Sequence, residues 1–432
     1  MTTSTMYNVE RLLHTGPGGP TDPGLADHVA RHGPVVIPSS DDPAWADVLR
    51  AEVAASGLAG RGGGGFPAAA KWDAVLRSHR RPVVVVNAME GEPASAKDRA
   101  LLAWSPHLVL DGAELVAALA GARSVVVCVA DDRDDSARAT QRAIVERQRA
   151  GSARELSVRR PPARYVTGEE SALVSWLERE DARPVLRIDK SVPLQVGRRP
   201  VLLHNAETLA QVALIARHGA AWFRQLGAED APGSTLVTVS GAVRTPGVVE
   251  VELGTPVDEI VLRCGPTGPM AGYLVGGYGG AWLAPELAGT PLAPTPLARA
   301  GATLGVGIVV ALPVTSCGIA ETARITRWMA GESAGQCGPC VYGLPAIAGD
   351  LEDLAAGRAD AGVLGRIDDR CRTVFGRGAC RHPDGVARMV RSALSVFAAD
   401  AAAHAAGRAC PGRHQASVMS FPAAPALTGG ES

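Results

Sequence analysis

The chain has 432 residues, long enough for roughly two to four domains with substantial cores. Its 43 basic and 44 acidic residues nearly cancel, and hydrophobic and charged residues make up 46% and 20% of the chain. This composition is typical of a globular protein, and it excludes binding to nucleic acid or to a membrane surface through bulk positive charge.

The amino-terminal segment, residues 1–25, is rich in Thr, Gly and Pro and predicts a loose arm. It has no positively charged start followed by an apolar stretch and a small-residue cleavage site. We therefore expect a cytoplasmic protein, peripheral to a membrane complex at most, with no direct membrane insertion.

Residues 26–230 show the pattern of a layered α/β domain. Short β-branched runs at residues 83–86 and 124–129 alternate with stretches rich in Ala, Leu and Arg. This alternation predicts a sheet covered by helices, with glycine-rich and charged loops at the strand ends.

A glycine-rich loop at residues 60–67, GRGGGGFP, lies early in this domain. Residues 51–59 before it predict a helix, whereas a simple Rossmann fingerprint requires a strand there. Backbone N–H groups of residues without Cβ atoms can face a phosphate or a flat ring, and Pro67 suits the first turn of a following helix. Lys71, one turn later, could reach the same anion. The alternative is a surface loop that binds nothing.

The predicted strand at residues 83–86 leads into residues 87–93, NAMEGEP, with Lys97 close behind. In a layered α/β fold, ligands gather at the carboxyl ends of strands, where this segment falls. The carboxylates of Glu90 and Glu92 could accept hydrogen bonds from ribose hydroxyls or from a carboxamide. Taken alone, the motif would favour a solvated acidic turn.

Two further segments carry polar groups. Residues 165–173, YVTGEESAL, open a predicted helix, and two acids at a helix start are also plain stabilisers of the helix dipole. Residues 204–209, HNAETL, supply amide and hydroxyl groups of the kind that hold a flavin ring or a phosphate.

Residues 231–315 change to a period of two and predict a small β-rich module. Residues 235–239 and 248–252 flank a turn signal at residues 245–247. The longest stretch without a formal charge, residues 300–320, is interrupted by Pro313 and by glycines. We therefore expect a buried strand with flanking loops there, and no membrane span.

Residues 316–408 are rich in Ala, Leu and Arg and predict helices with a break near residues 343–345. Residues 409–432 have the composition of a disordered tail. Five of the chain's eight cysteines lie from Cys337 onward. Without a secretion signal, this usage favours metal or redox chemistry over a disulfide framework.

Taken in order, the four loops resemble those of the flavin-binding subunit of respiratory complex I and of its relatives in NAD-linked formate dehydrogenases and hydrogenases. The matching family patterns are GRGGxGFPxxxKW, NAxEGEPxxxKDR, YxxGEExAL and NNxETL, and they align with residues 60–72, 87–99, 165–173 and 204–209. The resemblance implies an α/β fold with a Rossmann-like FMN-binding layered domain, a small ubiquitin-like β-rich insert of the SLBB type and a C-terminal helical iron–sulfur bundle.

The resemblance also implies FMN as a cofactor and NADH as a substrate. Hydride would pass from the nicotinamide to the flavin, with no protein acid or base. Phe66, Glu90 and Glu92 would contact the nicotinamide nucleotide. The full set of implied nucleotide contacts is Gly60, Arg61, Gly62, Gly63, Gly65, Phe66, Lys71, Asn87, Glu90, Gly91, Glu92, Tyr165, Gly168, Glu169, Glu170, Asn205 and Thr208.

Two departures from the family pattern concern nucleotide binding. Asp73 and Ala74 stand where the family has a second phenylalanine, and residues 183–187 lack a KPPFP stretch. An aromatic stack on a base contributes about 1 to 3 kcal/mol, so these losses weaken NADH binding. The sequence therefore supports FMN more firmly than NADH.

Residues 332–340, ESAGQCGPC, resemble the family's ESCGxCxPC iron–sulfur signature. Cys337 and Cys340 match its second and third cysteines, and Cys380 matches the fourth, which lies about forty residues on. Ala334 stands at the first position, where alanine cannot ligate iron.

The cluster prediction therefore leaves alternatives open. A [4Fe–4S] cluster could take Cys371, Cys317 or a non-cysteine group as its remaining ligand, or the cluster could hold three irons. Without a cluster, Cys337 and Cys340 would be a thioredoxin-like redox pair or buried structural cysteines.

The sequence thus predicts an NADH dehydrogenase-like oxidoreductase that passes electrons through FMN to an iron–sulfur cluster. Its partners would be redox proteins such as a ferredoxin-like or thioredoxin-fold [2Fe–2S] subunit, and no nucleic acid. One alternative is a non-catalytic scaffold subunit of a redox assembly. Another is a flavin and iron–sulfur subunit that uses ferredoxin instead of NADH.

Overall fold

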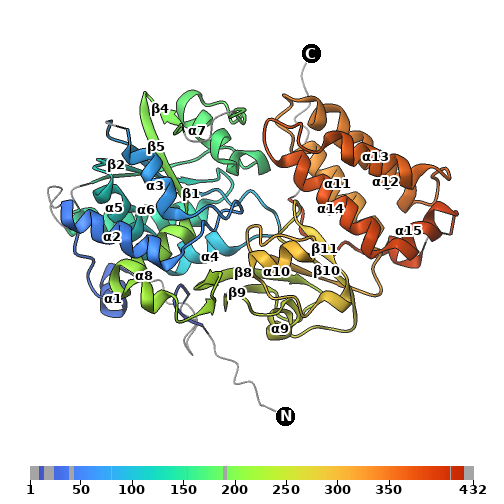
Figure 1. The fold of residues 1–432 in the computed structure, drawn as a ribbon, viewed down its shortest axis with the longest axis horizontal. Helices are drawn as coiled ribbons and strands as arrows, with labels where there is room; N and C mark the ends of the chain where they lie inside the picture. Colours follow the sequence, from blue (N-terminus) through green and yellow to red (C-terminus); the bar gives the residue numbers. More distant parts are fainter. Residues whose placement is uncertain are drawn as a thin grey trace, which may run out of the picture.

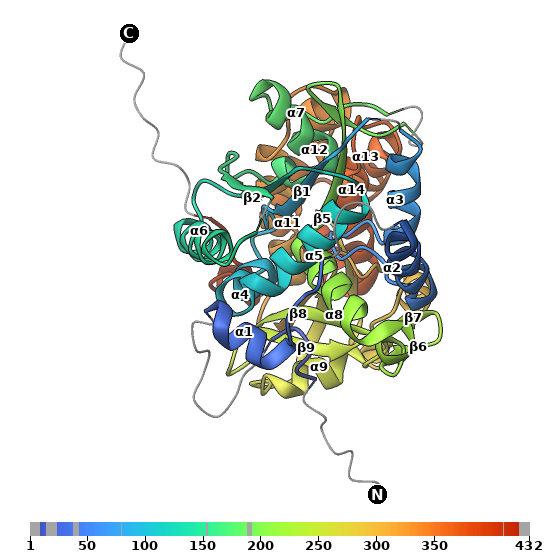
Figure 2. The same cartoon turned by 90° about the vertical axis from the view of Figure 1, so that its left-hand side faces the viewer.

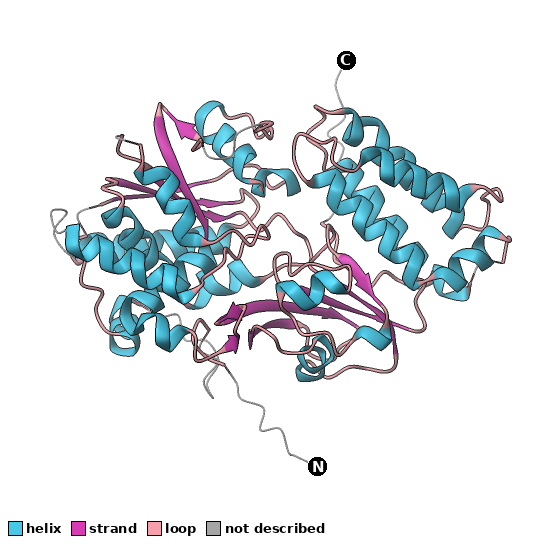
Figure 3. Ribbon diagram, in the orientation of Figure 1, coloured by secondary structure: helices cyan, strands magenta, loops and turns pink. Residues whose placement is uncertain are grey.

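The computed structural model describes residues 9–13, 24–37, 43–78, 80–152, 154–187, 192–408 and 410–422. Figure 1 shows three parts: an α/β part on the left, a β-rich part at the lower centre and a helical bundle on the right. Figure 3 shows that strands are confined to the first two parts. The α/β class and the three-part composition predicted from the sequence are confirmed.

The first sheet has the strand order β3-β2-β1-β5-β4. Its strands are β1 (Val83–Ala88), β2 (Ser124–Val129), β3 (Glu155–Arg159), β4 (Gln195–Val196) and β5 (Arg199–Asn205). All neighbouring pairs are parallel except β4 and β5. From β1 the chain proceeds outward to β2 and β3 and then returns to the other side of β1 as β5. The carboxyl ends of β1 and β5 therefore form a topological switch point, where ligands bind in open α/β sheets.

The β-branched run in β1 explains why this strand is central. Val84 and Val86 point to one face and belong to the large helical core, whereas Val83 and Val85 point to the other. The first face is covered by α2 (Pro43–Ser56), α3 (Ala68–Leu76), α4 (Lys97–Trp104), α5 (Pro106–Leu119), α6 (Asp134–Arg149) and α8 (Ala206–Phe223). Helix α7 (Glu170–Arg179) packs on the second face. Figure 2 shows α2, α4, α5 and α8 gathered beside β1 and β5, with α1 (Leu25–His32) outside them.

The second sheet has the strand order β11-β10-β12-β8-β9. It contains β8 (Ser234–Gly241), β9 (Gly247–Glu252), β10 (Met270–Val275), β11 (Ala281–Leu283) and β12 (Ile308–Pro313). The antiparallel β8–β9 hairpin confirms the predicted strands and turn. The buried strand predicted within residues 300–320 is β12, which pairs in parallel with β8. Within the described ranges, no helix has the length and apolar character that a membrane crossing requires.

The two faces of this sheet have different partners. Helices α9 (Val257–Arg263) and α10 (Pro294–Arg299) pack on one face, in a core that contains Val237, Val239 and Val309. The other face, with Trp282 and Ile308, shares a core with the helical bundle. Short elements complete the connections: β6 (Gly227–Ala228), β7 (Ala231–Pro232), η1 (Tyr165–Gly168), η2 (Pro285–Leu287) and η4 (Pro411–His414).

The bundle contains α11 (Gly318–Gly331), α12 (Leu344–Ala355), α13 (Val363–Val374), α14 (His382–Val396) and α15 (Ala398–Ala405). The predicted break near residues 343–345 is wrong. A π-helical turn, η3 (Pro339–Gly343), leads directly into α12, and Gly343 and Leu344 both have right-handed helical backbone angles. Pro345 is tolerated because it lies in the first turn of α12.

The predicted loose arm is wrong for residues 9–13. Leu12 and Leu13 are 2% and 3% exposed, and their backbone N–H groups donate to the Glu250 carboxylate at 2.8 and 3.2 Å. The Arg11 guanidinium stacks on the Trp222 ring at 3.7 Å. This segment is ordered because it adds two apolar side chains to the helical core. The rest of residues 1–25, apart from 24 and 25, lies outside the described residues.

The predicted disordered tail is wrong for residues 410–422, which we call the C-terminal strap. The Tyr278 hydroxyl donates to the Ser420 carbonyl oxygen, and Met419 is 6% exposed. The Arg324 guanidinium donates to the carbonyl oxygens of Arg413 and Gln415 at 3.2 and 3.3 Å. The strap is ordered because partners from distant segments hold it. Residues 423–432 lie outside the described residues.

Candidate functional site

The glycine-rich loop is a closed turn between two helices. Helix α2 ends at Ser56, and the Gly60 N–H donates to the Phe66 carbonyl oxygen at 2.9 Å. Gly63 and Gly65 have φ angles of 92° and 60°, which side chains other than glycine rarely adopt. As the sequence predicts, a helix and not a strand precedes the loop, so the loop is not a simple Rossmann fingerprint.

The outer side of this loop is uncovered. Residues 62–67 are exposed, and a Cβ atom placed on Gly64 or Gly65 would meet no atom within 4 Å. The Phe66 side chain is 60% exposed. The loop therefore presents bare backbone and one aromatic ring, and this open surface fits a flat ring or a phosphate group.

The polar ends of β1 and β5 meet beside the loop. Asn87 and Asn205 are register partners, and the Asn205 side-chain amide donates to the Asn87 carbonyl oxygen at 3.2 Å. The Asn87 amide donates to the Gly168 carbonyl oxygen at 2.9 Å. A Cβ atom on Gly62 would lie 3.4 Å from the Asn205 Cβ atom. The structure thus brings all four sequence loops together at the switch point.

Two further contacts join these loops. The Lys71 ammonium lies 2.7 Å from the Glu170 carboxylate, and both side chains are partly exposed, at 24% and 34%. The Arg61 N–H donates to the Thr208 hydroxyl at 2.9 Å. Lys71 is therefore beside the uncovered loop, where the sequence predicts it, with one carboxylate as its partner.

Glu169 has a structural role in this arrangement. Its carboxylate accepts from the Ala172 N–H at 2.9 Å and caps α7. For Glu169, the alternative that the acids at this helix start stabilise the helix therefore holds. The Ser171 hydroxyl also donates to it, at 2.5 Å. Burial raises the pKa of Glu169, and these hydrogen bonds oppose that rise.

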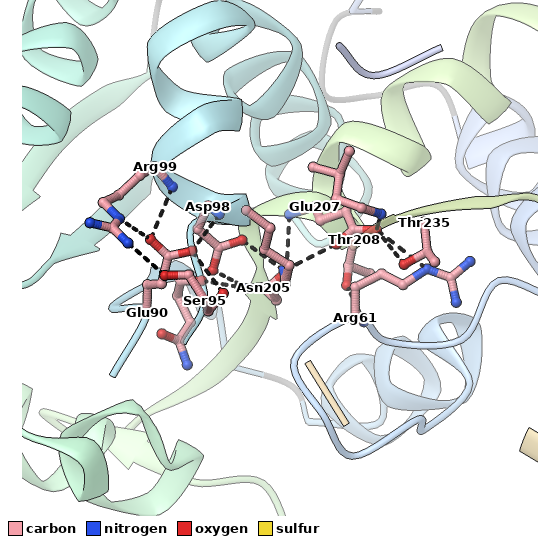
Figure 4. A network of polar contacts seen from close by, with 12 residues as sticks. Arg61, Glu90, Ser95, Asp98, Arg99, Asn205, Glu207, Thr208 and Thr235 are labelled. Atoms are coloured by element: carbon pink, nitrogen blue, oxygen red, sulfur yellow. Dashed lines mark hydrogen bonds and ion pairs between the residues drawn. The ribbon is translucent and has the colours of Figure 1, made fainter. Parts of the chain in front are cut away.

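A buried charge network lies beneath the loops. The Lys97 ammonium contacts the carboxylates of Asp98 at 2.8 Å and Glu207 at 3.0 Å, and it donates to the Asn205 side-chain oxygen at 2.9 Å. Figure 4 shows Asp98, Asn205 and Glu207 of this network, with Thr235 beyond them. Burial alone would lower the pKa of Lys97, but the two carboxylates raise it above its ordinary value. The network fixes the Asn205 side chain at the end of β5.

The Glu90 carboxylate accepts hydrogen bonds from the protein itself. It accepts from the Asp98 N–H at 2.8 Å, the Arg99 side chain at 2.8 Å and the Ser95 hydroxyl at 2.9 Å (Figure 4). The Glu90 side chain is 1% exposed, and its φ angle of 46° is unusual for a residue other than glycine. Both oxygens are occupied at the amino end of α4. The acidic segment is therefore no solvated turn.

The Arg61 side chain also points away from the loop surface. Its guanidinium donates to the Ser234 carbonyl oxygen at 3.1 Å and lies 3.7 Å from the Glu207 carboxylate, with only 3% of the side chain exposed. Burial lowers the pKa of Arg61, and Glu207 opposes this. At Arg61, only the backbone is placed near the uncovered side of the loop.

Glu92 lies at the junction with the β-rich part. Its carboxylate accepts from the Tyr278 N–H at 3.0 Å, and a Cβ atom on Gly277 would come within 2.6 Å of it. Gly91 beside it has no room for a side chain, because a Cβ atom there would lie 3.0 Å from the carbonyl oxygens of Arg164 and Tyr165. Burial raises the pKa of Glu92 to about 8, and the backbone hydrogen bond from Tyr278 opposes this rise.

The raised pKa of Glu92 makes stability depend on pH. Between about pH 4.5 and 8 the folded state holds a proton on Glu92 that the unfolded state releases, so this group lowers the free energy of unfolding as pH rises. In Glu92→Gln the free energy of unfolding should fall less steeply with pH, by at most about 1.4 kcal/mol per pH unit. Urea unfolding at several pH values measures the slope. Glu155→Gln, which removes an exposed carboxyl, should leave the slope unchanged, and an equal effect of both variants would contradict the assignment.

Cys337, Cys340 and Cys380 lie together at the start of the bundle. Burial, together with the neighbouring thiols of Cys337 and Cys380, raises the pKa of the Cys340 thiol to about 12. The Ser333 hydroxyl opposes this rise, and it accepts from the Gly335 N–H at 3.0 Å. Three soft sulfur ligands, two on the segment that enters η3 and one just before α14, fit an iron–sulfur cluster. The cysteine pattern gives no signal for Ser333, although this residue lies beside Ala334 in the signature.

The two cysteines proposed as alternative ligands lie elsewhere. The Cys371 thiol is fully buried in α13, and its charged neighbours are Asp368 and Arg391. The Cys317 thiol lies 3.6 Å from the His404 ring nitrogen. The thiols that act on Cys340 are those of Cys337 and Cys380, whereas Cys371 shares the bundle core with Cys340.

Tyr165 connects the α/β part to the bundle. Its backbone N–H donates to the Glu332 carboxylate at 2.8 Å, and its ring packs edge-on against Trp328 and His382, with ring centroids 5.8 and 5.3 Å apart. The loop that carries Gly168 thus begins at a residue packed against the cysteine-bearing segment.

Comparison with known proteins gives the family. Residues 53–214 match the Nuo51 FMN-binding domain, residues 236–271 the SLBB domain and residues 320–404 the NADH-ubiquinone oxidoreductase-F iron-sulfur binding region. These matches fall in the α/β part, the first half of the β-rich part and the bundle, and they support FMN and a [4Fe–4S] cluster as cofactors.

The similar proteins agree with these matches. The chain is 32% identical over 377 residues to the F 2 subunit of the NADH-quinone oxidoreductase of Rhizobium meliloti (strain 1021), covering 82% of this chain and 88% of that protein. It is 31% identical over 379 residues to the F subunit of the Streptomyces coelicolor NADH-quinone oxidoreductase, covering 84% of each. A solved NAD+-reducing [NiFe]-hydrogenase has a TM-score of 0.76 at 32% identity, and the match covers 85% of this chain and 64% of the hydrogenase chain.

The resemblance inferred from the four loops and the cysteine signature is therefore confirmed. Its three matched regions follow the order of the three structural parts. The chain belongs to the family of the FMN-binding flavoprotein subunits of NADH-quinone oxidoreductase, a family of oxidoreductase components.

Proposed function

We propose that this chain takes electrons from NADH to FMN and passes them through an iron–sulfur cluster to a partner subunit. The observation that carries the proposal is the convergence of four loops on the uncovered glycine turn at the β1–β5 switch point. Bound FMN supplies the chemistry that the side chains lack, because it accepts a hydride and releases electrons singly.

The residues around the glycine turn fit FMN. The bare backbone of residues 62–65 offers N–H groups, the Lys71 ammonium offers a positive charge for a phosphate, and the amides of Asn87 and Asn205 are held in fixed positions. The remaining proposed contacts are Gly60, the backbone of Arg61, Gly168, Glu170 and Thr208. The protein's role is to orient the flavin ring and keep water away from it.

NADH would approach the exposed side of the loop. Phe66 is the proposed contact with free surface, whereas both oxygens of Glu90 are occupied by protein donors. Glu92 has a donor at Oε2, while its buried Oε1 has no hydrogen-bond partner among the described residues. Gly91 and Tyr165 support the site through backbone contact between their loops. Loss of the family's second phenylalanine leaves Phe66 as the aromatic face nearest the loop surface.

Phe66→Ala is expected to raise the KM for NADH about 5- to 150-fold, the range that follows from losing one aromatic stack of about 1 to 3 kcal/mol. FMN content and stability should not change, because the ring is 60% exposed. Steady-state kinetics with ferricyanide as acceptor measures the change. Phe375→Ala removes a ring of similar exposure, 53%, in the bundle and should leave KM unaltered. An unchanged KM in Phe66→Ala would remove Phe66 from the NADH site.

The cluster would be held by Cys337, Cys340 and Cys380. The Ser333 hydroxyl is a candidate for the position that Ala334 cannot fill, because Ser333 is next to Ala334 and its hydroxyl lowers the pKa of the Cys340 thiol. The cluster supplies a one-electron path out of the flavin site. Tyr165 and its contacts hold the two sites together.

The similar proteins are subunits of multisubunit complexes, so this chain also works with partner subunits. We propose a ferredoxin-like or thioredoxin-fold [2Fe–2S] subunit as the electron acceptor. In the cell the assembly would lie in the cytoplasm, peripheral to a membrane complex.

The proposal is tested on anaerobically purified full-length protein. We expect bound FMN, and bleaching of its absorbance by NADH. Failure to bind FMN would overturn the proposal. If the protein binds FMN and reduced ferredoxin bleaches its absorbance while NADH does not, the electron donor is ferredoxin and not NADH. A protein with neither reaction would be a scaffold subunit, the interpretation that Ala334 and the missing aromatics favour.

A further inference from the structure

Three metal-ligating side chains from separate segments meet inside the bundle. They are Cys317, directly before α11, His404 in α15 and Cys410 in the C-terminal strap. Their ligand atoms all lie within 4.8 Å of one another. Within the described ranges this is the one such group of three His, Cys, Asp or Glu side chains.

The His404 ring is oriented as a metal ligand would be. Its Nδ1 atom lies 3.0 Å from the Ala355 carbonyl oxygen and 3.2 Å from that of Leu354. Because carbonyl oxygens only accept, Nδ1 carries the proton, and the lone pair of Nε2 faces the Cys410 N–H at 3.3 Å and the Cys317 sulfur at 3.6 Å. A backbone carbonyl behind the ring is the usual support of a metal-binding histidine. The imidazole is fully buried, so its direction is fixed by packing.

The spacing of the ligand atoms fits zinc. With Zn–S of about 2.3 Å, Zn–N of about 2.05 Å and a tetrahedral angle, the sulfur and nitrogen atoms should be about 3.6 Å apart. Cys317 Sγ and His404 Nε2 are 3.6 Å apart. Thiolate and imidazole together are ligands that zinc prefers over magnesium or calcium.

The strap is built to approach Cys317 closely. A Cβ atom on Gly412 would lie 2.7 Å from the Thr315 carbonyl oxygen and 3.0 Å from the Cys317 nitrogen, so a glycine is required there. The Cys410 N–H donates to His404 Nε2 at 3.3 Å, and a metal ion on Nε2 would take the place of this hydrogen bond. The Arg413 guanidinium donates to the Ala356 carbonyl oxygen at 3.0 Å. These contacts bring the second sulfur to the histidine from a segment 93 residues after the first.

We propose that Cys317, His404 and Cys410 bind one Zn²⁺ ion, which fastens the C-terminal strap to the bundle. Cys410 is partly exposed, so solvent can supply the fourth ligand. Zinc undergoes no redox change, and the site therefore takes no part in electron transfer. Its role is to join α11, α15 and the strap, since metal binding is coupled to the folding of the segments that carry the ligands.

The test is metal analysis of the full-length protein purified from zinc-supplemented medium. We expect about one zinc per chain in the native protein, and loss of most of it in Cys410→Ser and His404→Gln. FMN and iron content should not change in either variant. Cys264→Ser removes another buried cysteine, in the core of the β-rich part, and should keep the zinc.

Three results would overturn the proposal: zinc absent from the native protein, iron lost from Cys410→Ser, or a disulfide-linked peptide joining Cys317 and Cys410 in fresh protein. A measurement on the native chain covers the case in which the variants fold poorly. Chelation of zinc should speed tryptic cleavage after Arg408 and Arg413, and added zinc should restore resistance. Cleavage that is independent of zinc would contradict a fastening role.

Discussion

Lys97→Met is expected to lower the free energy of unfolding by about 3 to 5 kcal/mol, because the buried Asp98 carboxylate loses its cation and Glu207 keeps only Arg61, at 3.7 Å. Lys97 is 2% exposed, and the side chains of Asp98 and Glu207 beside it are 5% and 0% exposed. A domain is commonly stable by only about 5 to 15 kcal/mol, so this is a large share of the total. Urea unfolding at pH 7 measures it. FMN content should also fall, because Lys97 holds Asn205.

The decrease in the free energy of unfolding caused by Lys97→Met should become smaller as pH falls. Burial raises the pKa of Asp98 to about 6 even with Lys97 opposing the rise, so removing the ammonium raises it further. Protonation then removes the unpaired charge below that pKa, and the variant approaches the native protein. Arg138→Met breaks an exposed pair, with side chains 66% and 99% exposed, and should cost less than about 1 kcal/mol. If Lys97→Met lowered the free energy of unfolding by a similarly small amount, water would have to reach the buried charge network and solvate its carboxylates.

Cys340→Ser is expected to remove the iron–sulfur cluster almost completely while FMN stays bound. A hydroxyl replaces one of three thiolates in a site that already lacks the family's first cysteine, so two thiolates remain. Iron and sulfide analysis with electron paramagnetic resonance measures the cluster. Reduction of the partner subunit should stop, whereas NADH should still reduce ferricyanide through the flavin.

A matched pair of variants tests the Cys340 result. Cys264→Ser removes a buried cysteine outside the bundle and should keep its iron. Ala334→Cys restores the family's first cysteine and should slow the loss of iron in air. If Cys340→Ser retained all of its iron, Cys340 would not be a ligand of the cluster.

The sequence predicted the elements whose signals are local. The period of two around residues 245–247 identified the β8–β9 hairpin, and the β-branched run at residues 83–86 identified β1. The four loop motifs were recognised as one site because their order matched a family. That Asn87 and Asn205 are register partners depends on a strand pairing across more than a hundred residues, and no local pattern contains it.

The sequence could not assign the orientation of charged side chains. Arg61 and Glu92 lie in cofactor-like motifs, yet their polar groups pair with Ser234 and Tyr278 of the β-rich part. The burial of Leu12 and Leu13 was missed for the same reason, since composition does not reveal a distant surface that accepts a short apolar pair. His404 gave no signal within an alanine-rich helix, and only the fold places it between two cysteines.

Tyr278 joins the three parts of the molecule through different atoms. Its N–H binds Glu92 of the α/β part, its hydroxyl binds Ser420 of the strap, and its ring packs edge-on against Trp328 of the bundle at 5.7 Å. Heat should therefore melt the chain in one cooperative transition, with no plateau for a surviving subdomain. An excised β-rich segment would expose the face that bears Trp282 and would self-associate instead of remaining monomeric.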